Sequence, residues 1–371
     1  MNLSYWEIKT WLTDVDFTII GSGIVGLSCA LELQQNYPKS KILVLEKGLL
    51  PQGASTKNAG FACFGSLSEI IDDLEHHSEE EVFQLVSKRI NGLTLLRKTF
   101  GDQHLDYRPH GGYELFLNED EALYQKCVAS KDRINKLLKP LFGEDVFSFK
   151  DNTFGFNHVI NKLGFNQFEA QIDTGKMMSS LLKKVSDAGI KVLNNCHVKA
   201  IEDGIDSVQT VTNAFQYKSS KVFVATNGFA GQLINENVQP ARAQVLITRP
   251  INDLKIKGTF HLDRGFYYFR NIDNRVLFGG GRNLDFKGEE TAEFGETKLI
   301  QDKLEELLKT TIIPDKKFEI EHTWSGIMGV GNQKKSIVKP LSKNVFCGVR
   351  LGGMGVAIGS IVGKDLANLI E

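Results

Sequence analysis

Cysteine is scarce in this 371-residue sequence, and its few positions follow no recognisable pattern. The five cysteines, Cys29, Cys63, Cys127, Cys196 and Cys347, lie far apart, and none belongs to a Cys-x-x-Cys pair. An odd, scattered set does not indicate a disulfide framework or a zinc site. We therefore expect no metal site and a reducing compartment, the cytoplasm.

The sequence also lacks a surplus of charge of either sign. Lysine and arginine total 44 against 45 aspartates and glutamates, which gives a formal net charge of -1. Proteins that bind nucleic acid or anionic membranes commonly carry a basic surplus. Neither partner is indicated, so the expected partner is a small molecule.

Long apolar runs are missing as well. The N-terminal stretch MNLSYWEIKTWLTDVD has acidic and aromatic residues where a signal peptide has a basic start and an apolar run, and no segment is long enough for a membrane span. Hydrophobic residues (42%) and charged residues (24%) occur at levels ordinary for a soluble globular protein. Because the chain is longer than one hydrophobic core usually supports, we expect two domains.

A glycine-rich turn follows the first apolar stretch. The segment DFTII (16–20) is apolar and β-branched without alternation, which is typical of a strand buried on both faces of a parallel sheet. Gly21, Gly23 and Gly26 come next and lead into a helical pattern that ends before Pro38. In such a unit the glycines permit a tight turn, a close approach to a pyrophosphate, and close packing of helix on sheet.

An acidic residue after the next strand completes a dinucleotide-binding fingerprint. The stretch KILVLEK places Glu46 there, where a carboxylate can accept hydrogen bonds from a ribose. The alternative is a glycine loop that merely precedes a helix, but the strand, the helix and the acid all occur in register. We interpret the unit as binding a dinucleotide. A glutamate in place of an arginine argues against NADP.

The segments after Glu46 resemble one family of flavoenzymes. ASTKNAGF (54–61) resembles the flavin-contacting segment of FAD-dependent amine and amino-acid oxidases, the family that contains D-amino-acid oxidase, glycine oxidase and sarcosine oxidase. VLNNCHVKAIE and SSKVFVATNGFAGQL resemble its adenine-holding hairpin and returning strand, and EHTWSGIMGVG resembles its Trp-x-Gly strand. NVFCGVRLGGMGVAIGSIVGKDLANLI resembles its closing strand, glycine turn and helix, whose N-terminus faces the pyrimidine end of the flavin. Within the family, SYWE, ATNG, PARAQV and WSGIMG are most similar to the gamma-glutamylputrescine oxidoreductase branch.

The resemblance covers the whole chain and implies FAD, held noncovalently because residues 54–61 contain no histidine or cysteine. It implies an α/β fold with a Rossmann-type FAD-binding domain on a parallel sheet, at residues 1–90, 171–234 and 326–371. An inserted α+β substrate domain on a mainly antiparallel sheet takes residues 91–170 and 235–325, where alternating stretches such as HGGYELFL and GFYYFRN predict strands. The fingerprint and the resemblance together predict these cofactor-binding residues: Gly21, Ser22, Gly23, Ile24, Gly26, Glu46, Lys47, Ser55, Thr56, Lys57, Asn58, Ala59, Gly60, Phe61, Val198, Ala225, Thr226, Gly228, Gly326, Gly353, Met354, Gly355 and Val356.

Two substrate anchors known from the family are missing from this sequence. WSGIMG places Met328 where glycine oxidases carry an arginine, and GGMGVA places Ala357 where sarcosine oxidases carry a lysine. A simple α-amino acid is therefore disfavoured. An amine, or a longer amino-acid derivative whose acid group is bound elsewhere, fits the sequence better.

The remaining polar candidates for catalysis are Tyr267, Tyr268 and Arg270 in FYYFR, Arg350 in GVRLGG and His110 in RPHGGYELF. Alternate side chains of a strand share a face, so Tyr268 and Arg270 should point together while Tyr267 points away. For each residue a structural role is an open alternative, such as a packed aromatic ring, a surface arginine, an ion pair or a lone structural histidine.

We predict an enzyme that transfers a hydride from the C–H of an amine or amino-acid derivative to flavin N5, giving an imine that water hydrolyses. Molecular oxygen is a candidate electron acceptor, and Lys57 a candidate for assisting that step. Two alternatives stay open. The donor is instead a 2-hydroxy acid, or the chain is an FAD-binding subunit of a larger complex without a substrate of its own.

Overall fold

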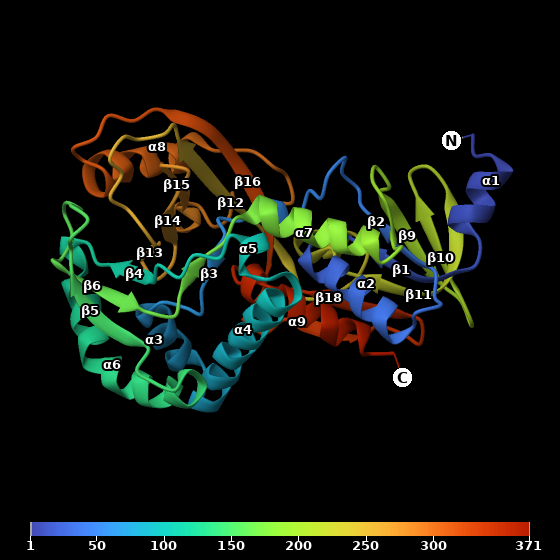
Figure 1. Ribbon diagram of the computed structural model, residues 1–371, viewed down its shortest axis with the longest axis horizontal. Coiled ribbons are helices and arrows are strands. Elements are labelled where there is room, and N and C mark those ends of the chain that lie inside the picture. Colours follow the sequence, from blue (N-terminus) through green and yellow to red (C-terminus); the bar gives the residue numbers. More distant parts are fainter. Residues whose placement is uncertain (1, 371) are drawn as a thin grey trace.

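Two β-sheets, with helices packed around them, make up the computed structural model, which describes residues 2–370. Figure 1 shows the sheets at opposite ends of an elongated molecule, with α4 (Glu79–Phe100) and α9 (Gly355–Ala367) between them. The expected α/β fold with a second, mainly antiparallel sheet is confirmed.

The first sheet is mostly parallel and draws neighbouring strands from distant parts of the chain. Its strands are β1 (Val15–Ile20), β2 (Ile42–Leu45), β8 (Lys191–Leu193), β9 (Val198–Asp203), β10 (Val208–Thr212), β11 (Gln216–Val224), β17 (Ile337–Pro340) and β18 (Val345–Val349). The main order is β17-β18-β11-β1-β2-β8, in which β17 is antiparallel to β18 and the β9–β10 hairpin extends from β11. Parallel pairing therefore joins three separated stretches of sequence.

The apolar sequence of β1 explains its central position. Along this strand Ile20 pairs with Leu45 of β2 on one side and with Val224 of β11 on the other. Nearly all its residues are buried, because helices such as α2 (Ile24–Asn36) pack on one face of the strand and residues of the β9–β10 hairpin pack on the other. The chain turns into α2 directly after β1, so the carboxyl end of the strand faces the start of a helix.

The second sheet is mainly antiparallel. Its strands are β4 (Gly112–Leu115), β5 (Phe147–Asp151), β6 (Lys162–Asn166), β12 (Gln239–Thr248), β13 (Thr259–Leu262), β14 (Tyr267–Ile272), β15 (Arg275–Gly280) and β16 (Ile320–Val330), in the order β16-β12-β15-β14-β13-β4-β6-β5. Only β4 and β13 pair in parallel, with Leu115 beside Leu262. A separate small sheet joins β3 (Phe61–Ala62) to β7 (Ala170–Gln171).

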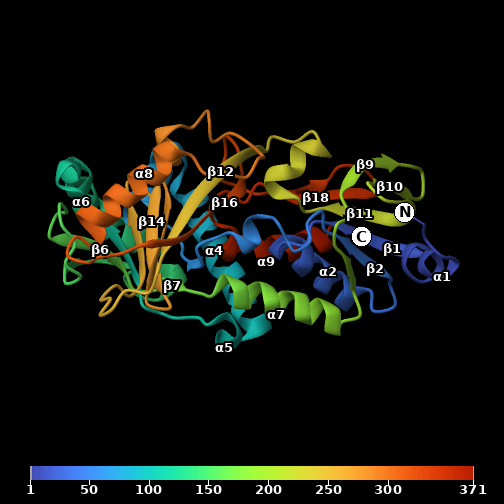
Figure 2. The same ribbon diagram turned by 90° about the horizontal axis from the view of Figure 1, so that it is seen from above.

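One face of the second sheet packs on an apolar core. Phe260 and Phe269, on β13 and β14, stack with ring centroids 4.6 Å apart, and Ile300 and Leu304 of α8 (Lys298–Leu307) belong to the same buried cluster. Because side chains alternate along a strand, the neighbouring residues of β13 and β14 point to the opposite face. Figure 2 shows α8 on the side of this sheet away from α9.

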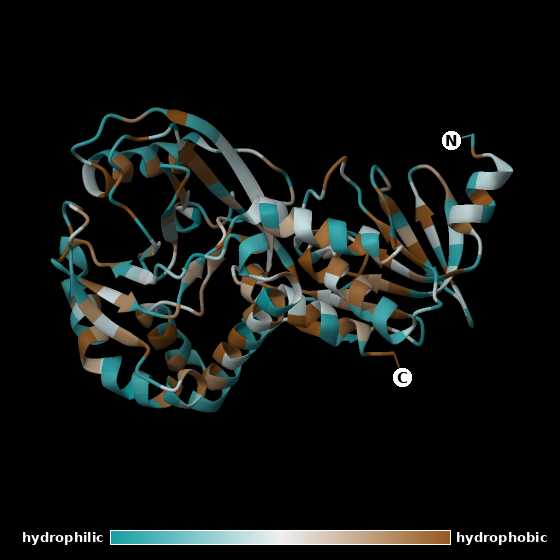
Figure 3. Cartoon of the chain, in the orientation of Figure 1, coloured by the Kyte–Doolittle hydropathy of each residue, from teal (hydrophilic) through white to brown (hydrophobic). Residues whose placement is uncertain are grey.

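The helices cover the first sheet and connect it to the second. The remaining helices are α1 (Tyr5–Glu7), α3 (Leu67–His76), α5 (Asp102–Leu105), α6 (Glu121–Phe142) and α7 (Thr174–Asp187). Leu27 of α2, Val86 of α4 and Val362 of α9 lie in one buried core. Figure 3 shows hydrophilic residues along the outer side of α6, whose buried residues are few.

Two elements run through the predicted domain boundaries. The helix α4 continues through residue 90, and β16 continues through residue 325. The division of the chain at these residues therefore stays a prediction. Within residues 2–370, no helix combines the length and the apolar character needed to cross a membrane.

Candidate active-site cavity

A cavity of about 590 Å³ connects the two sheets. It begins at the carboxyl end of β1 and reaches the face of the second sheet that is opposite its apolar core. A volume of several hundred Å³ is typical of small-molecule and cofactor sites. We describe this cavity from the first sheet to the second.

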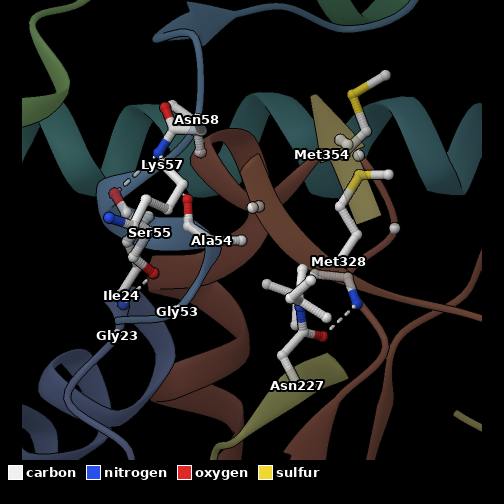
Figure 4. A pocket seen from close by; sticks show the side chains of 18 of the residues that line it. Gly23, Ile24, Gly53, Ala54, Ser55, Lys57, Asn58, Asn227, Met328 and Met354 are labelled. Carbon is white, nitrogen blue, oxygen red and sulfur yellow. Dashed lines mark hydrogen bonds between the residues drawn. The ribbon is translucent and has the colours of Figure 1, made fainter. Parts of the chain in front are cut away.

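The turn after β1 forms the first end of the cavity. Gly21 has φ +106°, which favours glycine, and a Cβ on Gly26 would lie 1.9 Å from the Gly21 carbonyl oxygen. The helix α2 can therefore begin this close to the turn only with glycine at position 26. Gly23 and Ile24 line the cavity, and the Ile24 N–H donates to Ser55 Oγ at 2.9 Å (Figure 4). The positive end of α2 thus faces a site suited to phosphate.

Glu46 lines the cavity beside this turn and is held by hydrogen bonds. Its Oε2 accepts from the Ser22 N–H at 3.2 Å and the Ser22 hydroxyl at 2.6 Å, and its Oε1 accepts from the Gly48 N–H at 2.9 Å. The Gln52 N–H makes a fourth, long hydrogen bond to Oε1 at 3.4 Å, and this weak bond is the one that a ribose hydroxyl could replace. Ser22, predicted to bind the cofactor, does not line the cavity and instead orients Glu46.

Residues 54–61 line the middle of the cavity, and the second sheet holds their backbone in place. Trp324 Nε1 donates to the Lys57 carbonyl at 2.9 Å, and Arg270 Nε donates to the Ala59 carbonyl. Burial lowers the pKa of Arg270 to about 10, against a raising effect from nearby carboxylates. Arg270 does not line the cavity, so this predicted catalytic residue lies behind the segment and supports it.

The start of α9 forms another wall of the cavity. Residues 353–356 line it, and no side chain among residues 2–370 caps the first N–H groups of this helix. Thr226 also lines the cavity, and its buried hydroxyl has no hydrogen-bond partner among the described residues. Two helix starts, a fixed carboxylate and an unpartnered hydroxyl along one cavity fit the pyrophosphate, the ribose and the flavin of FAD.

Most of the predicted cofactor-binding residues line the cavity, and the exceptions have structural roles. The predicted residues in the lining are Gly21, Gly23, Ile24, Glu46, Lys47, Ser55, Lys57, Asn58, Ala59, Gly60, Phe61, Val198, Ala225, Thr226, Gly326, Gly353, Met354, Gly355 and Val356. Besides Ser22 and Gly26, Thr56 lies outside and donates to the Pro51 carbonyl at 2.7 Å. Gly228 also lies outside, packed on β16, where a Cβ would be 2.5 Å from the Met328 carbonyl oxygen.

Cys63 and His197 line the cavity too, although no cofactor role was predicted for either. Burial raises the pKa of the Cys63 thiol well above its usual range, and burial lowers the pKa of His197. Since the thiolate is the reactive form of cysteine, this environment keeps Cys63 unreactive. Noncovalent attachment of FAD stays a prediction.

On the second sheet, a row of cross-strand neighbours includes His261, Tyr268 and Val245, which line the cavity. Glu114, His261, Tyr268, Gly279 and Val245 lie opposite one another on successive strands. A Cβ on Gly279 would lie 2.7 Å from the Tyr268 ring, so the glycine makes room for the ring to lie across the sheet. Burial raises the pKa of Tyr268 to about 12, which keeps its hydroxyl protonated at neutral pH. Tyr268 therefore faces the cavity as a neutral donor.

His261 is a cavity residue that sequence reasoning missed. Its Nε2 lies 3.0 Å from Glu169 Oε2, and its Nδ1 lies 4.0 Å from Glu69 Oε2. Burial alone lowers the pKa of His261, but the charge and hydrogen bond of Glu169, followed by the charges of Glu69 and Glu114, raise it to about 9. The imidazole is therefore a cation at neutral pH, placed in the wall next to Tyr268.

No local sequence pattern predicts this ion pair. Glu169 is 92 positions from His261 and reaches it because Gly112 of β4 leaves space, since a Cβ there would lie 2.0 Å from the carboxylate. The Glu169 carboxylate also accepts from the Thr259 hydroxyl at 3.0 Å. A lone histidine in TFHLDRG has no such partner nearby in sequence, and only strand pairing brings the groups together.

Three other predicted catalytic residues lie outside the cavity. Tyr267 points to the opposite face from Tyr268, as strand alternation predicts, and packs in the apolar core. Arg350 has φ +63° and donates to the Lys335 carbonyl at 3.0 and 2.9 Å, so it ties down a loop. His110 is exposed in the loop before β4, and partial burial with nearby cations lowers its pKa.

Comparison with known proteins is consistent with this geometry. A family model described as "DAO: FAD dependent oxidoreductase" matches residues 16–369. A curated relative, the probable oxidoreductase OrdL of Haemophilus influenzae, is 21% identical over 393 residues, covering 97% of this chain and 84% of its own.

Solved structures of similar fold include several enzymes. Glycine oxidase from Geobacillus kaustophilus matches with a TM-score of 0.76 at 17% identity, covering 96% of this chain and 94% of that chain. Iminodiacetate oxidase from Chelativorans sp. BNC1 matches with a TM-score of 0.75 at 18% identity, covering 95% of each chain. L-proline dehydrogenase from P. horikoshii matches with a TM-score of 0.74 at 18% identity, covering 96% of this chain and 93% of that chain. At such identities the likeness shows the fold.

Proposed function

Because the chain belongs to the DAO family of FAD-dependent oxidoreductases, we propose that it oxidises an amine or amino-acid derivative at the C–H bond beside nitrogen. The observation that carries this proposal is the continuous cavity between the nucleotide-binding turn of the first sheet and Tyr268 and His261 of the second. The names of the glycine oxidase, iminodiacetate oxidase and proline dehydrogenase of similar fold support a nitrogen-bearing substrate.

The cofactor-binding residues divide the work along the cavity. In the proposal, the start of α2 at Gly23 and Ile24 binds the pyrophosphate, and Glu46 binds a ribose. The uncapped start of α9 stabilises negative charge at the pyrimidine end of the flavin. When bound, FAD would supply a hydride acceptor for the substrate carbon, and water would hydrolyse the imine to a carbonyl compound and either ammonia or an amine.

The second sheet contributes the substrate side. The Tyr268 hydroxyl is a neutral donor that can orient a substrate acceptor atom. His261 is already protonated at neutral pH, so it acts by its positive charge and is not the base. The Glu69 carboxylate lines the cavity 4.0 Å from His261 Nδ1 and is the group we assign to accept a proton from the substrate ammonium. Loss of that proton frees the nitrogen lone pair, which assists departure of the hydride.

The test is reduction of the purified holoenzyme without oxygen. Amines, amino acids, N-substituted amino acids and 2-hydroxy acids are added singly under argon, and the visible absorption of the flavin is recorded. We expect bleaching with at least one nitrogen-bearing compound, together with release of a carbonyl product. Bleaching by hydroxy acids alone overturns the proposal in favour of a hydroxy-acid enzyme.

Oxygen as electron acceptor is tested in the same cuvette. After reduction, air is admitted and the return of the flavin absorption is timed, with hydrogen peroxide assayed in parallel. Rapid recovery with peroxide supports an oxidase, and slow recovery that an added electron-accepting dye accelerates supports a dehydrogenase.

A further inference from the structure

Arg282 lies at the second-sheet end of the cavity, and no acidic side chain in the described part of the chain pairs with it. It opens a short 3₁₀ turn (Arg282–Leu284) directly after β15, where Gly281 has φ +78° and turns the chain. Its side chain lines the cavity and is half-buried. The guanidinium carbon lies 4.8 Å from the centre of the Phe286 ring, a cation–π contact that holds one face of the guanidinium.

A nearby arginine on the same sheet shows how such a group is normally satisfied. Arg242 of β12 makes a two-pronged pair with Glu289, at 2.8 Å for both nitrogens. Arg282 makes no ion pair and no side-chain hydrogen bond with any of residues 2–370. Burial lowers the pKa of Arg282, and the more distant charges of Glu289 and Glu290 act against that lowering. A partly desolvated guanidinium whose N–H donors are unused and that lines a ligand cavity is suited to binding an anion.

Two other cations at this end of the cavity are already paired. His261 lies against Glu169, and Lys334, which lines the cavity, forms an ion pair with Asp73. Arg264 lines the cavity in the turn between β13 and β14 but is exposed to solvent. Arg282 is thus the half-buried, unpaired arginine in this part of the cavity among the described residues.

Opposite charge lies on the other side of the same hairpin turn. Glu69 and Asp72 of α3 line the cavity, and Gly265 of the turn packs on Glu69, where a Cβ would lie 2.9 Å from the carboxylate. On the far side, the Gly281 N–H donates to the Phe266 carbonyl at 2.9 Å, which attaches the Arg282 turn to this hairpin. A ligand beside the hairpin turn therefore meets carboxylates on one side and a guanidinium on the other.

We propose that Arg282 is the substrate's carboxylate anchor and that the substrate is an amino-acid derivative carrying both an amine and a carboxylate. This inference rests on the proposed function. It accounts for the two anchors missing from the sequence, since Met328 and the buried Ala357 supply no charge. The carboxylate is bound from the turn after β15, by a residue type that matches it with two parallel hydrogen bonds.

The experiment titrates the FAD-loaded enzyme with sodium acetate, butanoate and benzoate, and with uncharged butanamide, while following the shift of the flavin absorption band. We expect at least one carboxylate to bind and butanamide not to bind. Arg282→Met should lower the affinity for that carboxylate by about 10–100-fold, since a hydrogen bond to a charged group is lost. Arg282→Lys should recover part of the loss, because the charge remains and the planar fork does not.

Arg275→Met is the matched control, because Arg275 lies at the other end of β15 in an exposed pair with Glu321. The Arg275→Met enzyme should bind the carboxylate with the same affinity as the wild type. FAD affinity, measured by fluorescence on dilution, should be the same in all variants within about twofold. An Arg282→Met enzyme that binds carboxylates normally, or that loses FAD, overturns the inference. So does a wild-type flavin band that none of the three carboxylates perturbs.

The substrate test separates this inference from the proposed function. The pair 4-aminobutanoate and butylamine differs only in the carboxylate, and both are tried with the broader compound set under argon. Bleaching only by amines without a carboxylate overturns the assignment of Arg282 as the carboxylate anchor and leaves the proposal of amine oxidation standing. Bleaching by carboxylate-bearing amines supports both the proposed function and the anchor if Arg282→Met slows it at least tenfold at low substrate concentration. Arg275→Met should not slow it.

Discussion

The two ends of the cavity are built in different ways. The nucleotide end uses backbone: the Gly21 turn, the start of α2 and the start of α9, with Glu46 as its main side chain. The substrate end uses side chains from separate strands, Tyr268 and His261 among them, placed by sheet register. A backbone site needs particular residues close together in sequence, whereas a side-chain site needs only that distant strands pair. The difference teaches why one end can be recognised from the sequence and the other cannot.

The largest effect should come from breaking the buried ion pair of the substrate end. His261→Gln leaves Glu169 without its cation in a buried site, which should lower the free energy of unfolding by about 3–5 kcal/mol at pH 7. The measurement is urea unfolding in saturating FAD. Arg275→Gln removes one partner of an exposed pair with Glu321 and should leave the urea midpoint almost unchanged. Equal effects of the two variants would contradict a special role for burial.

The same pair predicts a pH dependence. The pKa of His261 rises from 6.5 to about 9 on folding, so the folded protein binds a proton more tightly than the unfolded chain. The resulting stabilisation is complete below pH 6.5 and is lost as the pH rises through 9, by about 3 kcal/mol if no other group compensates. The His261→Gln protein should lack this loss between pH 6.5 and 9. A parallel decline in both proteins would assign it to other groups.

At the nucleotide end, Gly26→Ala should release FAD. The new Cβ would collide with the Gly21 carbonyl oxygen, so α2 must move away from the turn that binds phosphate. We expect a mostly colourless protein and a loss of about 1–3 kcal/mol in stability from the forced shift. Gly231→Ala is the control, because nothing lies within 4 Å of a Cβ at that position. The readout is the ratio of flavin to protein absorption after gel filtration.

The smallest effect separates two adjacent tyrosines. Tyr268→Phe removes a hydroxyl that faces the cavity and should lower the rate of flavin reduction at low substrate concentration about tenfold, which corresponds to one hydrogen bond. Tyr267→Phe changes a ring in the apolar core and should leave that rate within about twofold. Stopped-flow spectroscopy under argon measures both. A larger effect of Tyr267→Phe than of Tyr268→Phe would show that Tyr267, and not Tyr268, faces the cavity.

Much of the nucleotide end could be predicted because its chemistry is local. Gly21, Gly23 and Gly26 fall within six positions, and Glu46 follows at the end of the next strand. The pattern could not show which of these residues contact the cofactor site. Ser22 orients Glu46, and Gly26 lets α2 lie close to the turn, but neither residue lines the cavity. Those roles depend on distances across a folded turn.

The substrate end was only partly predictable. Strand alternation placed Tyr268 and Tyr267 on opposite faces, as the structure confirms. The same reasoning could not show that Arg270 is covered by residues 54–61, that Arg350 ties down a loop, or that His110 lies outside. It gave no signal for His261 or Arg282, whose surroundings come from other strands and from α3.

The sequence by itself determined that this chain makes a buried parallel strand, a glycine turn and a helix, and that the unit binds a dinucleotide, because residue spacing along a few turns of chain sets that geometry. Only the tertiary structure decided which charges meet in the cavity. Glu169 and His261 are far apart along the chain, and their contact exists because two strands pair in one register and a glycine leaves room between them. Long-range register is a property of the folded sheet, so no short stretch of sequence carries it.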